Sequence, residues 1–126
     1  MPKEKYRLEV SVQVQYLADD SDPVASRYIF GYTIRITNVC DIGVKLLRRH
    51  WYIRDADGNL EEVEGEGVVG EQPHLAPGES FEYSSGCALS VPFGSMQGHY
   101  LMTAEDGVEF QADIPEFFLI GPRTLH

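Results

Sequence analysis

The sequence predicts an all-β protein, a β-sandwich of about seven or eight antiparallel strands. Apolar and polar side chains alternate over several stretches, turn residues separate these stretches at short intervals, and no segment shows sustained helical periodicity. A barrel would give a similar pattern and is the alternative. The 126 residues suffice for one core, so we expect a single domain spanning residues 1–126.

The first two predicted strands show the alternation most clearly. Residues 6–16 place apolar side chains from Leu8 to Tyr16 on one face and polar ones on the other, which is typical of a half-buried antiparallel strand. Residues 19–23 combine three aspartates with proline and predict a turn; their spacing matches no known calcium loop. The next strand, residues 27–37, should supply the aromatic half of the core through Tyr28, Phe30, Tyr32, Ile34 and Ile36.

The third predicted strand, residues 44–54, carries the only basic cluster of the chain. Leu47, Trp51 and Ile53 share one face, interrupted by Arg49. Arg48, His50 and Tyr52 should lie on the other face. Arg48 and His50 are therefore candidate contacts for an anion or a partner, but we favour the alternative that the arginines of this cluster pair with the abundant carboxylates.

The remaining predicted strands follow turn signals. Asp57-Gly58 indicates a hairpin, with a return strand over residues 60–64, and Pro77-Gly78 precedes a strand over residues 80–89. Residues 97–103 and 108–114 alternate and flank a turn at Asp106-Gly107. Pro115 should end or bend the last of these strands. The apolar run at residues 117–120 then predicts a strand buried on both faces or an interface.

Residues 64–73 contain a Gly-x-Gly-x-x-Gly motif, which in dinucleotide-binding proteins follows a strand and opens a helix. Here Pro73 and Pro77 leave no room for that helix, and the glutamates of the segment would repel phosphate. We therefore predict a shaped loop that faces a partner. The two adjacent valines either fold back against the core edge or project outward as an anchor. The candidate binding residues are Gly65, Glu66, Gly67, Val68, Val69, Gly70 and Glu71.

Charge and composition exclude several classes of function. Twenty acidic and ten basic residues give a formal charge of −10, which repels nucleic acid and anionic membranes. No secretory signal and no apolar run of the roughly 20 residues that span a bilayer is recognisable, so we expect a cytoplasmic protein. Cys40 and Cys87 flank Trp51 as in immunoglobulin domains, but Ser85 stands where the tyrosine corner requires tyrosine. We therefore expect two free thiols.

No pattern of catalytic or metal-binding residues is recognisable. Gly78-Glu79-Ser80-Phe81-Glu82 lacks the closing glycine of a nucleophile elbow. The four histidines, His50, His74, His99 and His126, are scattered and form no pair with each other or with cysteine at zinc spacing. We therefore predict no enzyme activity, no cofactor and no metal site.

Several strings that together cover nearly the whole chain resemble the ApaG family. They are Arg49-His50-Trp51, Gly65-Glu66-Gly67-Val68-Val69-Gly70-Glu71-Gln72-Pro73, Leu75-Ala76-Pro77-Gly78-Glu79, Tyr83, Ser85-Gly86-Cys87 and Pro122-Arg123-x-Leu125-His126. The resemblance implies a small bacterial cytoplasmic protein with a fibronectin type III-like, immunoglobulin-like sandwich, associated genetically with cobalt tolerance and magnesium efflux. Related domains of eukaryotic F-box proteins and of a polymerase-interacting protein imply a protein-binding module.

Two function hypotheses follow. The first is a non-catalytic module that binds an unknown protein partner, as a monomer or homodimer. The alternative is a small-ligand protein that binds divalent cations, or pyrophosphate or nucleotide compounds, through the glycine motif.

Overall fold

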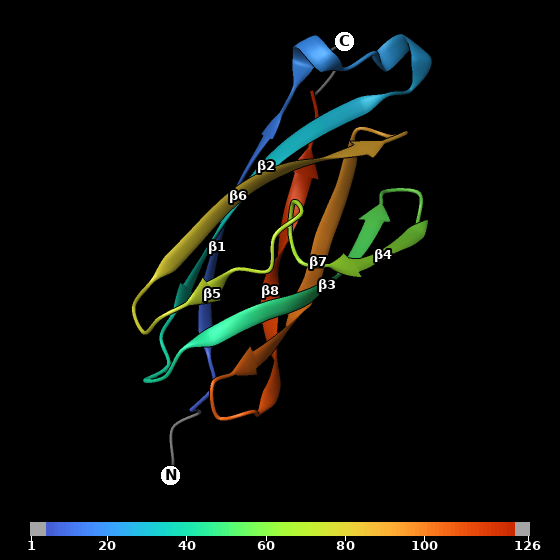
Figure 1. Cartoon of the computed structure of the whole chain (residues 1–126). Coiled ribbons are helices and arrows are strands. Elements are labelled where there is room, and N and C mark those ends of the chain that lie inside the picture. Colours follow the sequence, from blue (N-terminus) through green and yellow to red (C-terminus); the bar gives the residue numbers. More distant parts are fainter. Residues whose placement is uncertain (1–4, 123–126) are drawn as a thin grey trace.

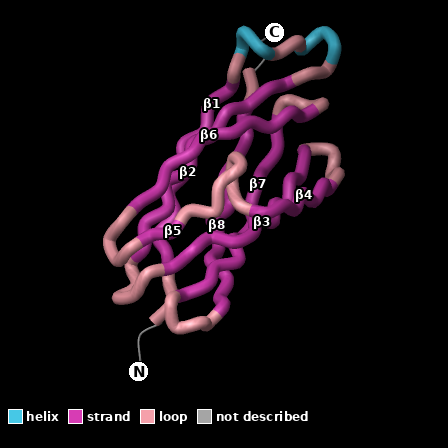
Figure 2. The backbone as a smooth tube through the Cα atoms, viewed as in Figure 1, coloured by secondary structure: helices cyan, strands magenta, loops and turns pink. Residues whose placement is uncertain are grey.

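The computed structural model describes residues 5–122, which form two antiparallel sheets packed face to face (Figure 1). The predicted all-β sandwich is confirmed, with eight strands (Figure 2). Two short 3₁₀ turns, η1 (Ala18–Asp20) and η2 (Pro23–Ala25), lie between the first two strands. No helix within residues 5–122 has the length and apolar character needed to cross a membrane. Arg123, Leu125 and His126, which belong to the terminal string noted above, lie outside the described residues.

The two sheets differ in size. The first sheet has the order β1-β2-β6 and consists of β1 (Leu8–Tyr16), β2 (Tyr28–Asn38) and β6 (Ser80–Leu89). The second has the order β4-β3-β7-β8 and consists of β4 (Leu60–Glu66), β3 (Val44–Asp55), β7 (Phe93–Ala104) and β8 (Glu109–Ile120). The short β5 (His74–Leu75) pairs with the first residues of β3. One side of the sandwich is therefore bounded by the edge strands β4 and β6.

The core lies between the sheets, and β2 supplies much of it as predicted. Phe30, Tyr32, Ile34 and Ile36 are all buried on its inner face. Trp51 of β3 meets Tyr32 edge-on, with ring centroids 5.6 Å apart. Aromatic pairs in this geometry stabilise a core beyond the area that they bury.

The inner face of β3 differs from the predicted one. Val44 and Leu46 are fully buried, whereas Leu47 is only half-buried. The register of β3 against β7 shifts between Leu46 and Arg48, which marks a bulge. Because a bulge adds one residue to one strand, it reverses the side-chain alternation beyond it. Even-numbered residues of β3 face the core before the bulge, and the odd-numbered residues Arg49 and Trp51 face it afterwards. The prediction that Leu47 shares the face of Trp51 was therefore wrong.

Three strand limits also differ from the predictions. β4 continues to Glu66, two residues beyond the predicted end, and β7 begins at Phe93. β8 runs through Pro115 without ending, since an edge strand tolerates a proline, but its register against β7 shifts there, between the pairs Gly98–Ile114 and Met96–Phe117. The run at residues 117–120 is not buried on both faces, because Leu119 is buried while Phe118 and Ile120 are exposed.

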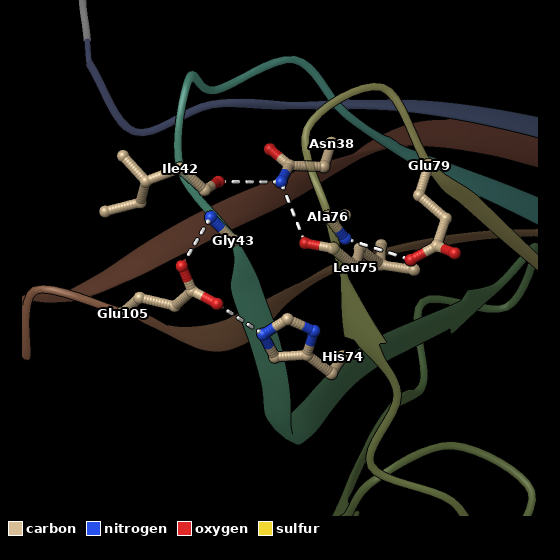
Figure 3. Close-up of polar contacts among 8 residues, drawn as sticks. All are labelled: Asn38, Ile42, Gly43, His74, Leu75, Ala76, Glu79 and Glu105. Carbon is tan, nitrogen blue, oxygen red and sulfur yellow. Dashed lines mark hydrogen bonds and ion pairs between the residues drawn. The ribbon is translucent and has the colours of Figure 1, made fainter.

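A buried asparagine that the sequence analysis did not single out joins the two sheets at one end (Figure 3). The Asn38 side chain, fully buried, donates from Nδ2 to the carbonyl oxygens of Ile42 and Leu75, at 2.9 and 3.0 Å. Its Oδ1 accepts from the backbone N–H of Cys40 at 2.8 Å. Satisfied buried amides of this kind fix how neighbouring segments pack.

Candidate functional site

The open side of the sandwich contains a hollow that is lined by both core and loop residues. A cavity of about 430 Å³ lies between β4 and β6, with Tyr32, Trp51, Tyr83 and Met96 among the residues that line it. A second cavity of about 280 Å³ adjoins it and shares Ile53, Glu61 and Ala88 with it. We call the two cavities together the edge groove. Its volume lies in the range of small-ligand sites, and its lining combines aromatic side chains with polar ones, among them Arg49, Glu61 and Ser85.

The predicted binding loop stands at the edge groove. Val68 is fully buried, whereas Val69 is 54% exposed, and both line the groove. Val68 therefore folds back against the core edge, whereas Val69 projects outward. Glu66, Gly70 and Glu71 are exposed as well. The expectation that Val68 is presented to a partner was wrong, because its side chain closes the core beneath the loop.

The loop has a defined and strained backbone. The N–H of Val68 donates to the carbonyl oxygen of Glu71 at 2.8 Å, and the N–H of Glu71 donates back to Val68 at 2.9 Å. Gly67 and Gly70 have φ angles of 64° and 82°, and Val69 has a φ of 42°. A β-branched residue adopts this left-handed conformation only at a cost, since its side chain crowds the backbone.

The structural context of the glycine motif is not that of a nucleotide site. Gly65 lies within β4, and the short strand β5 follows the loop where a dinucleotide fold has its helix. Gly65 instead makes room for Arg49: a Cβ at Gly65 would lie 2.7 Å from Cζ of that guanidinium. Arg49 Nη1 donates to the carbonyl oxygens of Glu66 and Gly67, at 3.1 and 3.0 Å. The first glycine of the motif therefore accommodates an arginine.

Arg49 was missed as a site residue, although it visibly interrupts an apolar face. It pairs across the sheet with buried Tyr100, so its side chain enters the sandwich at the edge groove. No carboxylate of residues 5–122 lies within 4.0 Å of its guanidinium. Nε and Nη2 make no hydrogen bond to those residues either. Since no buried side-chain nitrogen there lacks a partner, both atoms are accessible to solvent.

Two tyrosine hydroxyls lie near this guanidinium. Burial raises the pKa of Tyr32, and Ser85 and Arg49 partly offset this rise. Burial also raises the pKa of Tyr83, and Tyr100 and Arg49 partly offset that rise. The hydroxyls of Tyr83 and Tyr100 share a hydrogen bond of 2.5 Å. Because burial disfavours the phenolate, these groups stay protonated and can donate hydrogen bonds.

Both cysteines are free thiols, as predicted. Cys40 is buried, and Cys87 lines the edge groove. Burial, and then the nearby Glu61, raise the pKa of the Cys87 thiol to about 11. The thiolate is the nucleophilic form of cysteine, so Cys87 is poorly suited to nucleophilic chemistry at neutral pH.

The predicted contacts Arg48 and His50 lie elsewhere, on the outer face of the second sheet. His50 Nε2 lies 2.9 Å from Glu62, and Nδ1 lies 3.4 Å from Glu64. Its ring also stacks on Tyr52, with centroids 4.5 Å apart. His50 is thus paired with carboxylates. The favoured alternative, that the arginines pair with carboxylates, was wrong for Arg48 and Arg49, because neither has a carboxylate within 4.0 Å among residues 5–122. Arg48 lies opposite Glu66 of the predicted loop in the register of β3 and β4, but neither Arg48 nor His50 lines the edge groove.

Within residues 5–122, no three side chains of histidine, cysteine, aspartate or glutamate are grouped closely enough to hold a metal ion. His74, for example, meets only one carboxylate, that of Glu105, at 3.0 Å (Figure 3). Acidic residues lie in loops and on the exposed faces of strands such as β4, where water solvates them.

Comparison with known proteins gives a consistent result. The family described as the ApaG domain matches residues 18–104. Protein ApaG of Thiobacillus denitrificans is 58% identical over 122 residues, which are 97% of this chain and 96% of that protein. Protein ApaG of Nitrosomonas europaea is 55% identical over the same length and the same shares.

A solved structure supports the same relation. The crystal structure of the putative ApaA protein from Bordetella pertussis has 48% sequence identity and a TM-score of 0.92, and covers 98% of this chain and 100% of its own. The C-terminal domain of wzt, at 10% identity and a TM-score of 0.56 over 98% of this chain and 84% of its own, shares the fold alone.

Proposed function

Because this chain belongs to the ApaG family, we propose that it is a non-catalytic, cytoplasmic module that binds a protein partner at the edge groove and its glycine loop. The partner recognises exposed Val69 together with the aromatic wall of the groove. The resemblance associates the family with cobalt tolerance and magnesium efflux. Under this proposal that association depends on the partner and not on a metal held by this chain.

The strain at Val69 is the observation that carries the proposal. Val69 has a φ of 42° and is 54% exposed, so its side chain contributes little to the core while its backbone conformation costs energy. Strained, exposed residues are frequent at recognition sites, because folding alone does not favour them. The groove beside Val69 is lined by tryptophan, tyrosine and arginine, the residue types that dominate the hot spots of protein interfaces. The charge of −10 favours a basic partner surface.

A small-ligand role is the second candidate. It is favoured by Arg49, which lines a cavity of about 430 Å³ and whose Nε and Nη2 make no hydrogen bond to residues 5–122. Glu61, Glu66 and Glu71 border the groove or its loop and oppose pyrophosphate and nucleotides, which carry several negative charges. This candidate predicts capture that depends on a cation or on phosphate.

A photo-crosslinking amino acid with an aliphatic side chain in place of Val69, which keeps the apolar character of this position, tests the proposal. Irradiation in a lysate should yield a defined crosslinked protein, with and without magnesium or cobalt. Val24 is a matched control, because it is 98% exposed but lies on η2, away from the groove. Identical products from both positions, or products that require the cation, would overturn the proposed role.

The substitution Val69→Asn separates binding from stability. Asparagine tolerates the left-handed conformation, so we expect unchanged stability or a gain of up to about 1 kcal/mol, measured by urea denaturation. Capture of the crosslinked partner should nevertheless fall strongly. Full capture by Val69→Asn would exclude Val69 as the anchor.

A further inference from the structure

Arg49 offers the edge groove a hydrogen-bonding edge that no described residue uses. Nη1 is occupied by the carbonyl oxygens of Glu66 and Gly67, and this fixes the guanidinium in place. Nε and Nη2 remain accessible, without a partner or a nearby carboxylate among residues 5–122. Two parallel N–H groups on one side of a guanidinium match the two oxygens of a carboxylate.

The surroundings of Arg49 suit a carboxylate that is attached to an apolar group. Tyr32 and Tyr83 line the same cavity as Arg49, and a tyrosine hydroxyl can donate a hydrogen bond to an anion. Trp51, Val63 and Met96 line the same cavity and provide apolar surface. A carboxylate carries one charge, so the acidic surface repels it less than it repels pyrophosphate.

The groove also borders an unprotected strand edge. β6 is the last strand of the first sheet, and residues 84–88 read Ser-Ser-Gly-Cys-Ala, without the prolines and charges that usually guard an edge. Within residues 5–122, β6 makes no backbone hydrogen bond on the side away from β2. Every second residue of such a strand directs its N–H and C=O outward, where an extended peptide can pair with them.

We propose that the edge groove binds the C-terminal residue of a partner chain. The terminal carboxylate pairs with Nε and Nη2 of Arg49, the last side chain is apolar and enters the groove, and the preceding residues extend along β6. A chain terminus is the ligand that joins a carboxylate, an apolar side chain and free backbone groups. Exposed Glu61 on the groove wall favours a basic residue upstream in the peptide. This inference rests on the proposed function and specifies its ligand.

Fluorescence polarisation with short, N-terminally labelled peptides tests this assignment. The peptides contain lysine and end in leucine, either as the free acid or as the C-terminal amide. The free acid should bind about tenfold or more tightly than the amide, since only the acid forms the charged, bidentate pair. Equal binding of acid and amide, or no binding of either, would overturn the inference.

Matched variants identify the residue responsible. Arg49→Gln should abolish the preference for the free acid, and Arg49→Lys should reduce it, because lysine keeps the charge but lacks the fork. Arg48→Gln makes the same charge change at the neighbouring, outward-facing position and should keep the full preference. If Arg48→Gln lost as much of the preference for the free acid as Arg49→Gln, the preference would arise from overall charge. That result would contradict the proposed pairing.

Measurements on the wild-type protein do not depend on how the variants fold. Adding the free-acid peptide should shift the backbone amide NMR signals of residues 84–88 and the Nε–H signal of Arg49; shifts elsewhere with none at these positions would contradict the binding mode. Pyrophosphate should not displace the peptide at comparable concentration, and efficient displacement would indicate a small-anion site instead.

The two proposals fail in different ways. A partner that crosslinks at Val69 but shows no dependence on its terminal carboxylate would overturn this inference and leave the binding role intact. Conversely, peptides that require Arg49 but bind equally well to Val69→Asn, with no crosslinked protein, would support the carboxylate site and contradict the role of Val69.

Discussion

Single residues of the glycine loop have separable roles, although the motif repeats one residue type. Gly67 and Gly70 both have positive φ angles. A Cβ at Gly67 would lie 2.2 Å from the carbonyl oxygen of Glu71, whereas nothing lies within 4 Å of a Cβ at Gly70. The backbone conformation requires glycine at both positions, but only Gly67 is also required by lack of space.

Substitution by alanine should therefore separate the two effects. Gly70→Ala should lower the free energy of unfolding by about 1 kcal/mol through backbone strain. Gly67→Ala should cost at least about 1 kcal/mol more, because the carbonyl oxygen of Glu71 must move away from its hydrogen bond to Val68. Urea denaturation of both variants measures the difference, and equal losses would show that the loop relaxes freely around the new methyl group.

Nucleotide binding is a second property that tests the role of the glycine loop. We expect negligible ATP affinity for the wild-type protein and for Gly67→Ala, since no helix N-terminus faces the motif and its glutamates repel phosphate. Calorimetric titration checks this. Saturable binding of ATP that Gly67→Ala abolishes would identify the loop as a phosphate site after all.

At the scale of elements, the β3–β4 hairpin shows how a short turn signal becomes a specific structure. The predicted Asp-Gly turn is present, and Gly58 has a φ of 88°. The Asp55 carboxylate accepts hydrogen bonds from the N–H groups of Asp57 and Asn59, at 2.9 and 3.0 Å, and from Nδ2 of Asn59 at 3.1 Å. These hydrogen bonds, above all the one from Nδ2 of Asn59, hold the pKa of Asp55 below its ordinary value of 3.8.

The substitution Asn59→Ala should raise the pKa of Asp55 toward its ordinary value, because it removes the side-chain donor. A lowered folded-state pKa stabilises the protein above the unfolded pKa, and this contribution disappears as the pH falls through the folded value. The wild-type protein should therefore be more stable than Asn59→Ala at neutral pH, and the difference should vanish in acid. NMR titration of the Asp55 carboxyl group and denaturation at several pH values measure both effects; an unchanged pKa would show that backbone donors suffice.

At the scale of the whole molecule, the acidic charge is dispersed and not gathered into sites. The formal charge is −10, yet residues 5–122 contain no group of three potential metal ligands. A dispersed field attracts cations weakly, whereas tight binding requires several ligands in a fixed geometry.

Calorimetric titration with zinc, cobalt and magnesium should consequently detect only weak binding that salt screens. Since the protein carries many exposed carboxylates, the heat should show no defined stoichiometry. Submicromolar affinity at a fixed ratio would contradict this expectation and favour the hypothesis of a divalent-cation protein.

The strands and the motif context could be read from the sequence, whereas much of the candidate site could not. The inner face of β2 and the turn at Gly58 depend on local rules, and both predictions are confirmed. The predicted loop borders the groove, but Arg49 was passed over as an interruption of an apolar face. Its role depends on the bulge that follows Leu46 and on the room left by Gly65, neither of which alternation reveals.

The sequence by itself determined the fold class, the loop that contains Gly67 and Gly70, and the free state of both cysteines. Side-chain alternation and turn chemistry act over a few residues, so they are visible along the chain. Only the tertiary structure decided which valine is buried, how the bulge turns Arg49 inward, and that β6 leaves an open edge beside it. These features depend on packing between segments far apart in the sequence, where the filling of space selects one register and one loop conformation among several that local rules permit.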